Sequence, residues 1–217
     1  MSNNRGKLLT LIFAIIAYIS PLSAQECLDC HAKKNARAPR VDVKRFEKSV
    51  HKGNGCESCH QEASTVPHPK KMKPVLCAEC HADENAKVMA SGHDRTFVKR
   101  FGEKYRCTAC HDQAHYVESI RNADSTVNRG NVMQTCFACH AKAGPDANEK
   151  AKKMMASASY ATTVHGKAFL EKGNKKSAIC TDCHGSHDLE LPTNSASKVY
   201  KFNIPDTCGS CHAVIRS

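Results

Sequence analysis

The sequence predicts a mainly α-helical protein with much irregular loop and little or no β-sheet. Apolar residues recur at helical spacing in three segments, and no segment alternates convincingly enough for a strand. The 217 residues include no Trp, 6% aromatic residues and a mean hydropathy of −0.50, which is too little large apolar surface for one well-filled core. The 14 Cys and 13 His indicate that bulky groups other than apolar side chains supply the core.

Residues 1–24 are typical of an export signal peptide. A positively charged start precedes an apolar run from Leu8 to Ile19 and a small-residue segment that ends at Ala24. This run is shorter than the roughly 20 residues that cross a bilayer. We therefore expect cleavage after Ala24 and a periplasmic or extracellular mature chain. The alternative is an uncleaved segment that anchors the protein to the membrane.

The cysteines follow one pattern, because every Cys belongs to a C-x-x-C pair and a His follows each pair directly. This is the attachment signature of c-type haem: two thiols one helical turn apart reach the two vinyl groups on one porphyrin edge, and the His binds iron. Disulfides, structural zinc and dithiol redox sites also use paired cysteines, but none requires a His after every pair. We therefore expect seven covalent haems c. Motifs 1 to 7 are, in chain order, Cys27/Cys30/His31, Cys56/Cys59/His60, Cys77/Cys80/His81, Cys107/Cys110/His111, Cys136/Cys139/His140, Cys180/Cys183/His184 and Cys208/Cys211/His212.

From Cys27 to His212 the chain resembles the multihaem c-type cytochromes, in particular the low-potential, bis-histidine class III proteins and their larger relatives. The resemblance rests on the seven motifs and on six further histidines. It implies an exported electron carrier with little regular structure, wrapped around closely packed haems that form the core. It also implies that a second His, the distal ligand, binds each iron opposite the His of the motif.

The six further histidines flank motifs 2, 4 and 6. We call the three that precede these motifs the leading histidines and the three that follow them the trailing histidines. His115 and His187 lie four and three residues past their own motif His, a reach of only about 5–6 Å along a helix, so they are expected to ligate neighbouring irons. The alternative is that some of the six are ordinary surface or core residues. The leading histidines are His51, His93 and His165, and the trailing histidines are His68, His115 and His187.

This arrangement predicts one seven-haem domain over residues 25–217. Motif 1 lies near 25–40, and three two-haem modules follow near 49–81, 91–140 and 157–212. Seven irons need seven distal ligands and only six histidines remain, so one iron is left over, and we expect it to be that of motif 1. A lysine, the mature amino terminus near Gln25 or a neighbouring subunit could complete it. The methionine candidates are Met72, Met89, Met133, Met154 and Met155.

Helices are predicted over 41–51, over 83–100 with an interruption at Gly92, and over 145–172. Residues 61–76 and 192–206 are rich in proline and polar residues and are predicted as loops.

The formal net charge of +11 suggests an anionic partner, but aromatic residues do not alternate with the basic ones as single-stranded nucleic acid requires. Lysines that balance the haem propionates account for much of the excess, and the rest forms a solvated face or steers an acidic redox partner. We expect no nucleic-acid partner.

The expected function is electron transfer rather than catalysis. The chain would carry single electrons at low potential between redox partners, such as a membrane quinol dehydrogenase and a terminal reductase or an extracellular acceptor. One alternative is a haem enzyme that reduces a small oxyanion or sulfur species at one open iron. Another is a subunit of a cytochrome filament, in which a neighbouring copy supplies the missing ligand.

Overall fold

The structure is a computed structural model that describes residues 24–33, 38–94, 98, 102–103, 106–140 and 156–216. These residues form short helices joined by long irregular segments, with no strand among them, which confirms the coarse fold class. The elements are α1 (Ala24–His31), α2 (Val43–Phe46), α3 (Cys56–Cys59), η1 (Gln61–Ala63), η2 (Cys77–Glu79), α4 (Ala82–Ala90), η4 (Ala114–Tyr116), α6 (Val132–His140), α8 (Ala156–Thr162), α9 (Val164–Leu170), α10 (Cys180–His184), α11 (Ile204–Gly209) and η5 (Ala213–Arg216).

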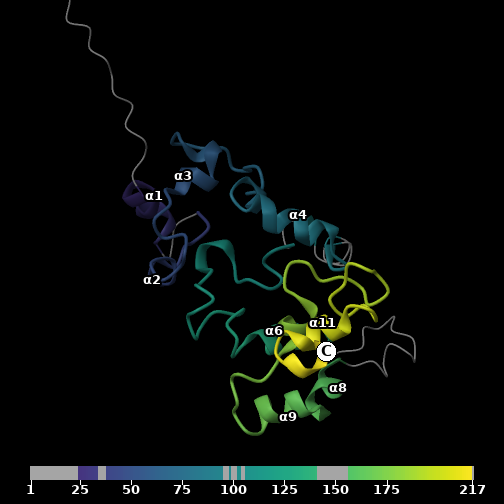
Figure 1. The fold of residues 1–217 in the computed structure, drawn as a ribbon. Coiled ribbons are helices and arrows are strands. Elements are labelled where there is room, and N and C mark those ends of the chain that lie inside the picture. The colour runs from purple at the N-terminus through teal and green to yellow at the C-terminus, as the bar shows by residue number, and fades with distance from the viewer. Residues whose placement is uncertain are drawn as a thin grey trace, which may run out of the picture.

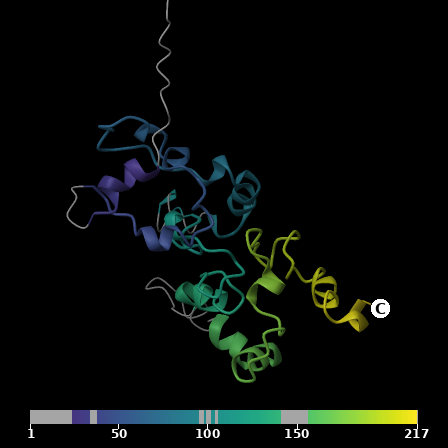
Figure 2. The ribbon, with the colours of Figure 1, turned by 90° about the vertical axis from the view of Figure 1, so that its left-hand side faces the viewer.

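The elements follow one another through space largely as they do along the chain. Figures 1 and 2 show α1 to α4 grouped at one end of the molecule and α6 to α11 at the other. The teal segment between the two groups, which carries motif 4, connects them in both views. The fold is therefore extended along the chain direction rather than wrapped around one centre.

The apolar core of the described residues is small. Its four buried apolar side chains come from α6, α9 and the residue before α10: Val132, Met133, Phe169 and Ile179. Other large apolar side chains are well exposed, among them Ile120 at 65% and Phe202 at 71%. A protein whose own side chains filled its interior would bury such groups, because each one contributes about 1.5–3 kcal/mol when fully buried.

One predicted helix is shorter in the structure, and a second is interrupted where the sequence indicated. The segment 41–51 forms helix only over α2, which begins after an Asp42 side chain that accepts a hydrogen bond from the Arg45 N–H at 3.2 Å. The segment 83–100 begins with α4, which starts one residue earlier and ends at Ala90, close to the interruption expected at Gly92. Asp94 and Val98 beyond it are helical again, and residues 95–97 and 99–100 lie outside the described residues. Ser91 ends α4, because its hydroxyl donates to the Val88 carbonyl at 2.7 Å and its backbone is extended.

The third predicted helix, 145–172, was wrong as one continuous element. Residues 145–155 lie outside the described residues, and the remainder is two helices, α8 and α9, separated at Thr163. The Thr163 side chain caps α9 by accepting a hydrogen bond from the Gly166 N–H at 3.0 Å. Gly166 permits this break, because a Cβ there would stand 2.0 Å from the Tyr160 carbonyl oxygen.

Both predicted loops are irregular over most of their length. Residues 61–76 contain only the short η1, and residues 192–206 contain no helix before α11 begins at Ile204. Residues 1–23 of the expected signal peptide lie outside the described residues. Within the part of the chain that is described, no helix is both long and apolar enough to cross a membrane.

Candidate haem centres

The seven motifs adopt closely similar backbone turns. Motifs 1, 5 and 6 end helices α1, α6 and α10, motifs 2 and 3 begin with α3 and η2, and motif 7 begins within α11. In motifs 2, 3, 4 and 7 the backbone N–H of the His donates to the carbonyl of the first Cys at 2.9–3.0 Å. This single helical turn brings both sulfurs and the imidazole to one side of the backbone.

The two cysteines of a pair differ in their exposure, which the sequence did not predict. The first cysteine of every motif is half-buried, whereas the second is exposed in five of the seven motifs. At these five positions the polypeptide leaves the second sulfur uncovered, so no buried site surrounds both thiols of the pair. The expectation that both thiols hold a bound group stays a prediction. A porphyrin edge joined to both sulfurs would cover it. The five exposed cysteines are Cys30, Cys59, Cys80, Cys139 and Cys211.

Each of the six leading and trailing histidines faces a different motif histidine. The ring centroids of these pairs are 5.8–6.3 Å apart. The six pairs are His31–His68, His60–His115, His51–His81, His111–His187, His93–His140 and His165–His212.

This spacing suits one iron between two imidazoles. A metal–nitrogen bond to imidazole is about 2 Å and the ring centre lies about 1 Å beyond the nitrogen, so two axial imidazoles have centroids about 6 Å apart. Ordinary aromatic contacts also fall between about 4.5 and 7 Å, so the distance alone does not distinguish the two. The pairing is also one-to-one, because each non-motif histidine faces a motif histidine and no motif histidine faces two of them.

The pairs follow a rule along the chain. Each leading histidine faces the next motif that has no flanking histidine, as His51 faces His81 of motif 3. Each trailing histidine faces a motif earlier than its own, as His187 faces His111 of motif 4. The trailing pairs have ring planes 20–28° apart, whereas the leading pairs are at 38–90°. His115 and His187 thus face motifs other than their own, and their ligation of neighbouring irons stays a prediction.

Two expectations differ from this arrangement. The modules are not self-contained, because only the leading histidine of each one pairs within its own module. Motif 1 is not the motif left over, because His31 faces His68 at 6.0 Å. The motif left over is motif 6: all 13 histidines are described, the six pairs use twelve of them, and His184 is the thirteenth.

Backbone carbonyls orient several of the imidazoles. The Nδ1 atoms of His31 and His51 lie 2.7 Å from the Pro39 carbonyl and 2.9 Å from the Ala114 carbonyl, respectively. The Nδ1 of His68 lies 3.1 Å from the Pro69 carbonyl. A carbonyl oxygen can only accept, so Nδ1 carries the proton and Nε2 keeps the lone pair that binds a metal.

Burial keeps several paired imidazoles neutral. It lowers the pKa of His93 and His111, and the facing imidazoles of His140 and His187 lower them further. The pKa values of His60 and His115 are lowered in the same way, first by burial and then by neighbouring imidazoles. The neutral form is the one that ligates metals, so these environments suit the role.

Cysteines of successive motifs lie against one another. A hydrogen bond with Cys107 lowers the pKa of Cys77 to about 6, which places motif 3 beside motif 4. A hydrogen bond with Cys136 lowers the pKa of Cys180 to about 7, which places motif 5 beside motif 6. In motif 1, burial and the neighbouring Cys56 of motif 2 raise the pKa of Cys27 to about 11.

The other pairs of successive motifs are also neighbours in space. Burial and the neighbouring Cys139 raise the pKa of Cys110, which relates motif 4 to motif 5. Burial and the neighbouring Cys208 raise the pKa of Cys183, which relates motif 6 to motif 7. Motifs 2 and 3 meet through their facing histidines, because His115 interacts electrostatically with His51. No disulfide joins any of the 14 cysteines, and no cluster of three or more metal-binding side chains occurs among the described residues.

Backbone hydrogen bonds join the segments of two leading histidines, His51 and His93, to the segment of the trailing histidine in the following module. The N–H of Val50, just before His51, donates to the Val117 carbonyl at 2.8 Å. The N–H of Gly92, just before His93, donates to the Leu189 carbonyl at 2.9 Å. Val117 and Leu189 each lie two residues after a trailing histidine, so the same contact occurs twice.

The second and third modules also share a long loop that sequence reasoning missed. The side-chain amides of Asn131 and Asn203 each donate to two carbonyls, at residues eight and six positions earlier. Thr135 and Thr207, just before motifs 5 and 7, each donate to the carbonyl nine residues earlier. The signal was present as matching Asn, Ser and Thr positions in 115–140 and 187–212.

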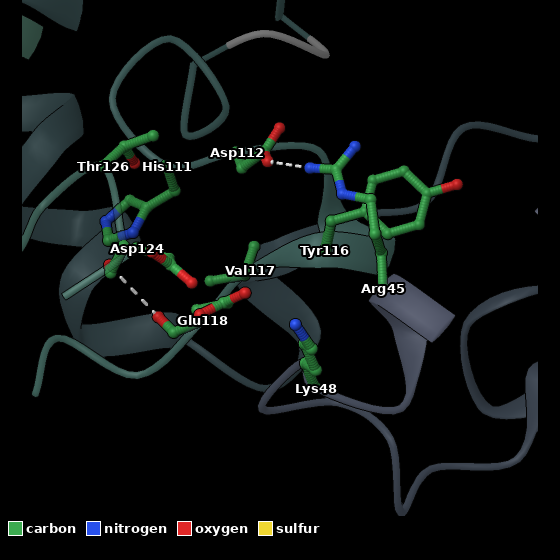
Figure 3. Close-up of a pocket in the computed structure, with 10 residues that line it drawn as sticks. Arg45, Lys48, His111, Asp112, Tyr116, Val117, Glu118, Asp124 and Thr126 are labelled. Carbon is green, nitrogen blue, oxygen red and sulfur yellow. Dashed lines mark hydrogen bonds and ion pairs between the residues drawn. The ribbon is translucent and has the colours of Figure 1, made fainter. Parts of the chain in front are cut away.

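A cavity of about 260 Å³ lies beside the motif 4 histidine, between the α2 region and the segment that follows His115. Figure 3 shows His111 on one side of this cavity and Arg45, Lys48 and Tyr116 on the other. Arg45 lies over the Tyr116 ring at 4.1 Å and pairs with Asp112 at 2.5 Å. Two basic side chains, Arg45 and Lys48, and three acidic ones, Asp112, Glu118 and Asp124, line the cavity.

Comparison with protein-family models, with curated proteins and with solved structures gave no match for this chain. The class of site is therefore argued from the residues themselves. Paired thiols beside an imidazole, and a second imidazole opposite it at about 6 Å, fit haem c in motifs 1 to 5 and 7. Motif 6 has the thiols and one imidazole.

Proposed function

We propose that the protein is a heptahaem c-type cytochrome that carries electrons between redox partners. The observation that carries this proposal is the one-to-one pairing of the leading and trailing histidines with six motif histidines. The paired cysteines would hold each group covalently, and the facing imidazoles would fill both axial positions. Haem c supplies reversible one-electron chemistry at its iron, and bis-imidazole ligation favours a low potential.

The order of the motifs in space supports a carrier. Each motif neighbours the next one along the chain, through cysteine contacts or through facing histidines, from Cys27 of motif 1 to Cys208 of motif 7. Close neighbours of this kind are what transfer of electrons along a protein requires. Export, periplasmic or extracellular location, and partners such as a quinol dehydrogenase and a terminal or extracellular acceptor form part of the same proposal.

The proposal accounts for several exposed apolar side chains, for the basic side chain at the cavity and for the exposed cysteines. Ile120, Leu191 and Phe202 would cover porphyrin faces, since they bury little surface against the described protein. Lys48, at the border of the cavity beside His111, would neutralise a propionate, whereas Arg45 already pairs with Asp112. The exposed second cysteines, such as those of motifs 1, 3 and 7, would be covered by the porphyrin edges that they bind. This arrangement would supply the core that the chain's own apolar residues do not form.

The test is the mass of the intact mature protein purified from an oxidising compartment of a host that attaches haem c. We expect a mass that exceeds the polypeptide by seven haems, with absorption bands typical of low-spin haem c. A polypeptide that carries disulfides or zinc in place of haem would overturn the proposal.

A further inference from the structure

Two motif histidines face the trailing histidine of the following module, and motif 6 is the third motif in this series. His60 of motif 2 faces the trailing histidine of the second module, His115. His111 of motif 4 faces the trailing histidine of the third module, His187. His184 of motif 6 is the next member of this series, and none of the six facing pairs among the described residues includes it.

The described residues of the third module also lack a backbone hydrogen bond that the first two modules make. In the first two modules, the residue before the leading histidine donates its backbone N–H to a carbonyl two residues after the next trailing histidine. Val164 occupies this position in the third module, before His165. Within the described residues Val164 has no such bond, and its side chain is 78% exposed. Two features of the described residues, the unpaired His184 ring and the Val164 N–H without this bond, therefore distinguish the third module from the first two.

The surroundings of His184 suit a ligand that faces an iron. Its side chain is exposed and lies near the His140 imidazole, so the described polypeptide leaves room beside the ring. Gly185, with a φ of +81°, ends α10 directly after it and turns the chain so that His187 goes to His111 instead. The nearest downstream histidine is thus committed to another motif.

From these observations we infer that the iron held by motif 6 has His184 as its only histidine ligand and keeps its other axial position open to a small lone-pair donor such as a diatomic gas. This inference rests on the proposed function, because it needs haem at motif 6. It moves the open position from motif 1, where the sequence favoured it, to motif 6. It also makes binding of a small molecule a second property of the carrier.

The experiment is a titration of the dithionite-reduced holoprotein with carbon monoxide, followed by its difference spectrum. We expect one haem in seven to bind. The assignment comes from two matched variants. His184→Ala removes the only histidine at motif 6, so the number of binding haems should stay at one, while the spectrum loses its imidazole character and added imidazole restores it. His31→Ala should leave His68 on the motif 1 iron and raise the number to two.

The outcomes separate the inference from the proposal beneath it. A wild-type holoprotein of full mass that binds no carbon monoxide would overturn the inference alone, since the motif 6 iron would then be six-coordinate. A second binding haem in His184→Ala would overturn it in the same way. If His31→Ala stays at one, the open iron belongs to motif 1. A mass short of seven haems would count against the proposed function itself.

Discussion

Single residues decide where the trailing histidines go, and Gly185 is the clearest example. Its φ of +81° and ψ of −169° are nearly inaccessible to other residues, and a Cβ there would stand 2.3 Å from Asp188 Oδ1. This conformation stops α10 at His184 and allows His187, three residues later, to face His111 of another module.

We expect Gly185→Ala to lower the free energy of unfolding by about 1–3 kcal/mol, because the strained backbone has no relief. Chemical denaturation measures this loss. Carbon monoxide titration should show one additional binding haem, since His187 moves away from motif 4. Gly53→Ala is the matched control, because nothing lies within 4 Å of its Cβ position, and its effect should stay within about 0.5 kcal/mol. Equal behaviour of the two variants would contradict the role given to Gly185.

At the scale of elements, the fold depends on ties between segments rather than on a continuous apolar core. Arg129, in the loop before α6, donates to the carbonyls of Lys175 and Ser177 and to both carboxylate oxygens of Asp182 at 2.7–3.0 Å. Asp182 lies inside motif 6 and also accepts a hydrogen bond from the Ile179 N–H at 2.8 Å. One side chain thus joins the second module to the motif that we infer to be open.

Removal of this tie by Arg129→Met should cost about 1 kcal/mol near pH 7, a small value because both side chains are partly exposed. The hydrogen bond from Arg129 is the largest cause of the lowered pKa of Asp182. A lowered pKa stabilises the fold above the unfolded value of about 3.9, and this stabilisation is lost as the pH falls through the folded value.

The difference between wild type and Arg129→Met in denaturant midpoints should therefore shrink below about pH 4. Arg121→Met is a suitable control, because Arg121 is exposed and its recorded hydrogen bond uses its backbone. A difference that persisted unchanged in acid would show that Arg129 acts through packing alone.

At the scale of the whole molecule, the facing histidine pairs connect the modules to one another. His68 faces motif 1, His115 faces motif 2 and His187 faces motif 4, so only one motif in each module has its facing histidine within that module. The contacts of Val50 with Val117 and of Gly92 with Leu189 run beside these ligands. We expect the chain to assemble as one unit around its haems rather than as three independent pieces.

Paired variants test these connections. His60→Ala with His115→Ala should add one haem that binds carbon monoxide, because both histidines face each other across one centre. His60→Ala with His187→Ala should add two, because His187 faces motif 4 instead. The masses of both double variants should still show seven haems. Equal numbers in the two would refute the cross-module pairing.

The sequence by itself determined the chemistry of this protein's predicted centres. The spacing in each C-x-x-C-H motif sets where two thiols and an imidazole lie on one helical turn, so motifs 1 to 7 could be read without a structure. The scarcity of large apolar residues likewise indicated a mainly helical, loop-rich fold, because such a composition cannot build a layered core. The division into flanked and unflanked motifs was also visible in the histidine positions.

Only the tertiary structure decided which histidines face one another and which thiols the chain covers. The partners lie 30 to 76 residues apart, as for His51 with His81 and His111 with His187, and no local pattern fixes contacts at that range. The exposure of Cys30, Cys80 and Cys211 likewise depends on which distant segments pack against each turn.

The same reason applies to the helix break and to the unmatched ligand. The break at Thr163 depended on a close approach of Gly166 to Tyr160, which helical periodicity does not reveal. The count of 13 histidines shows that one of them has no partner. Only the arrangement in space shows that this histidine is His184.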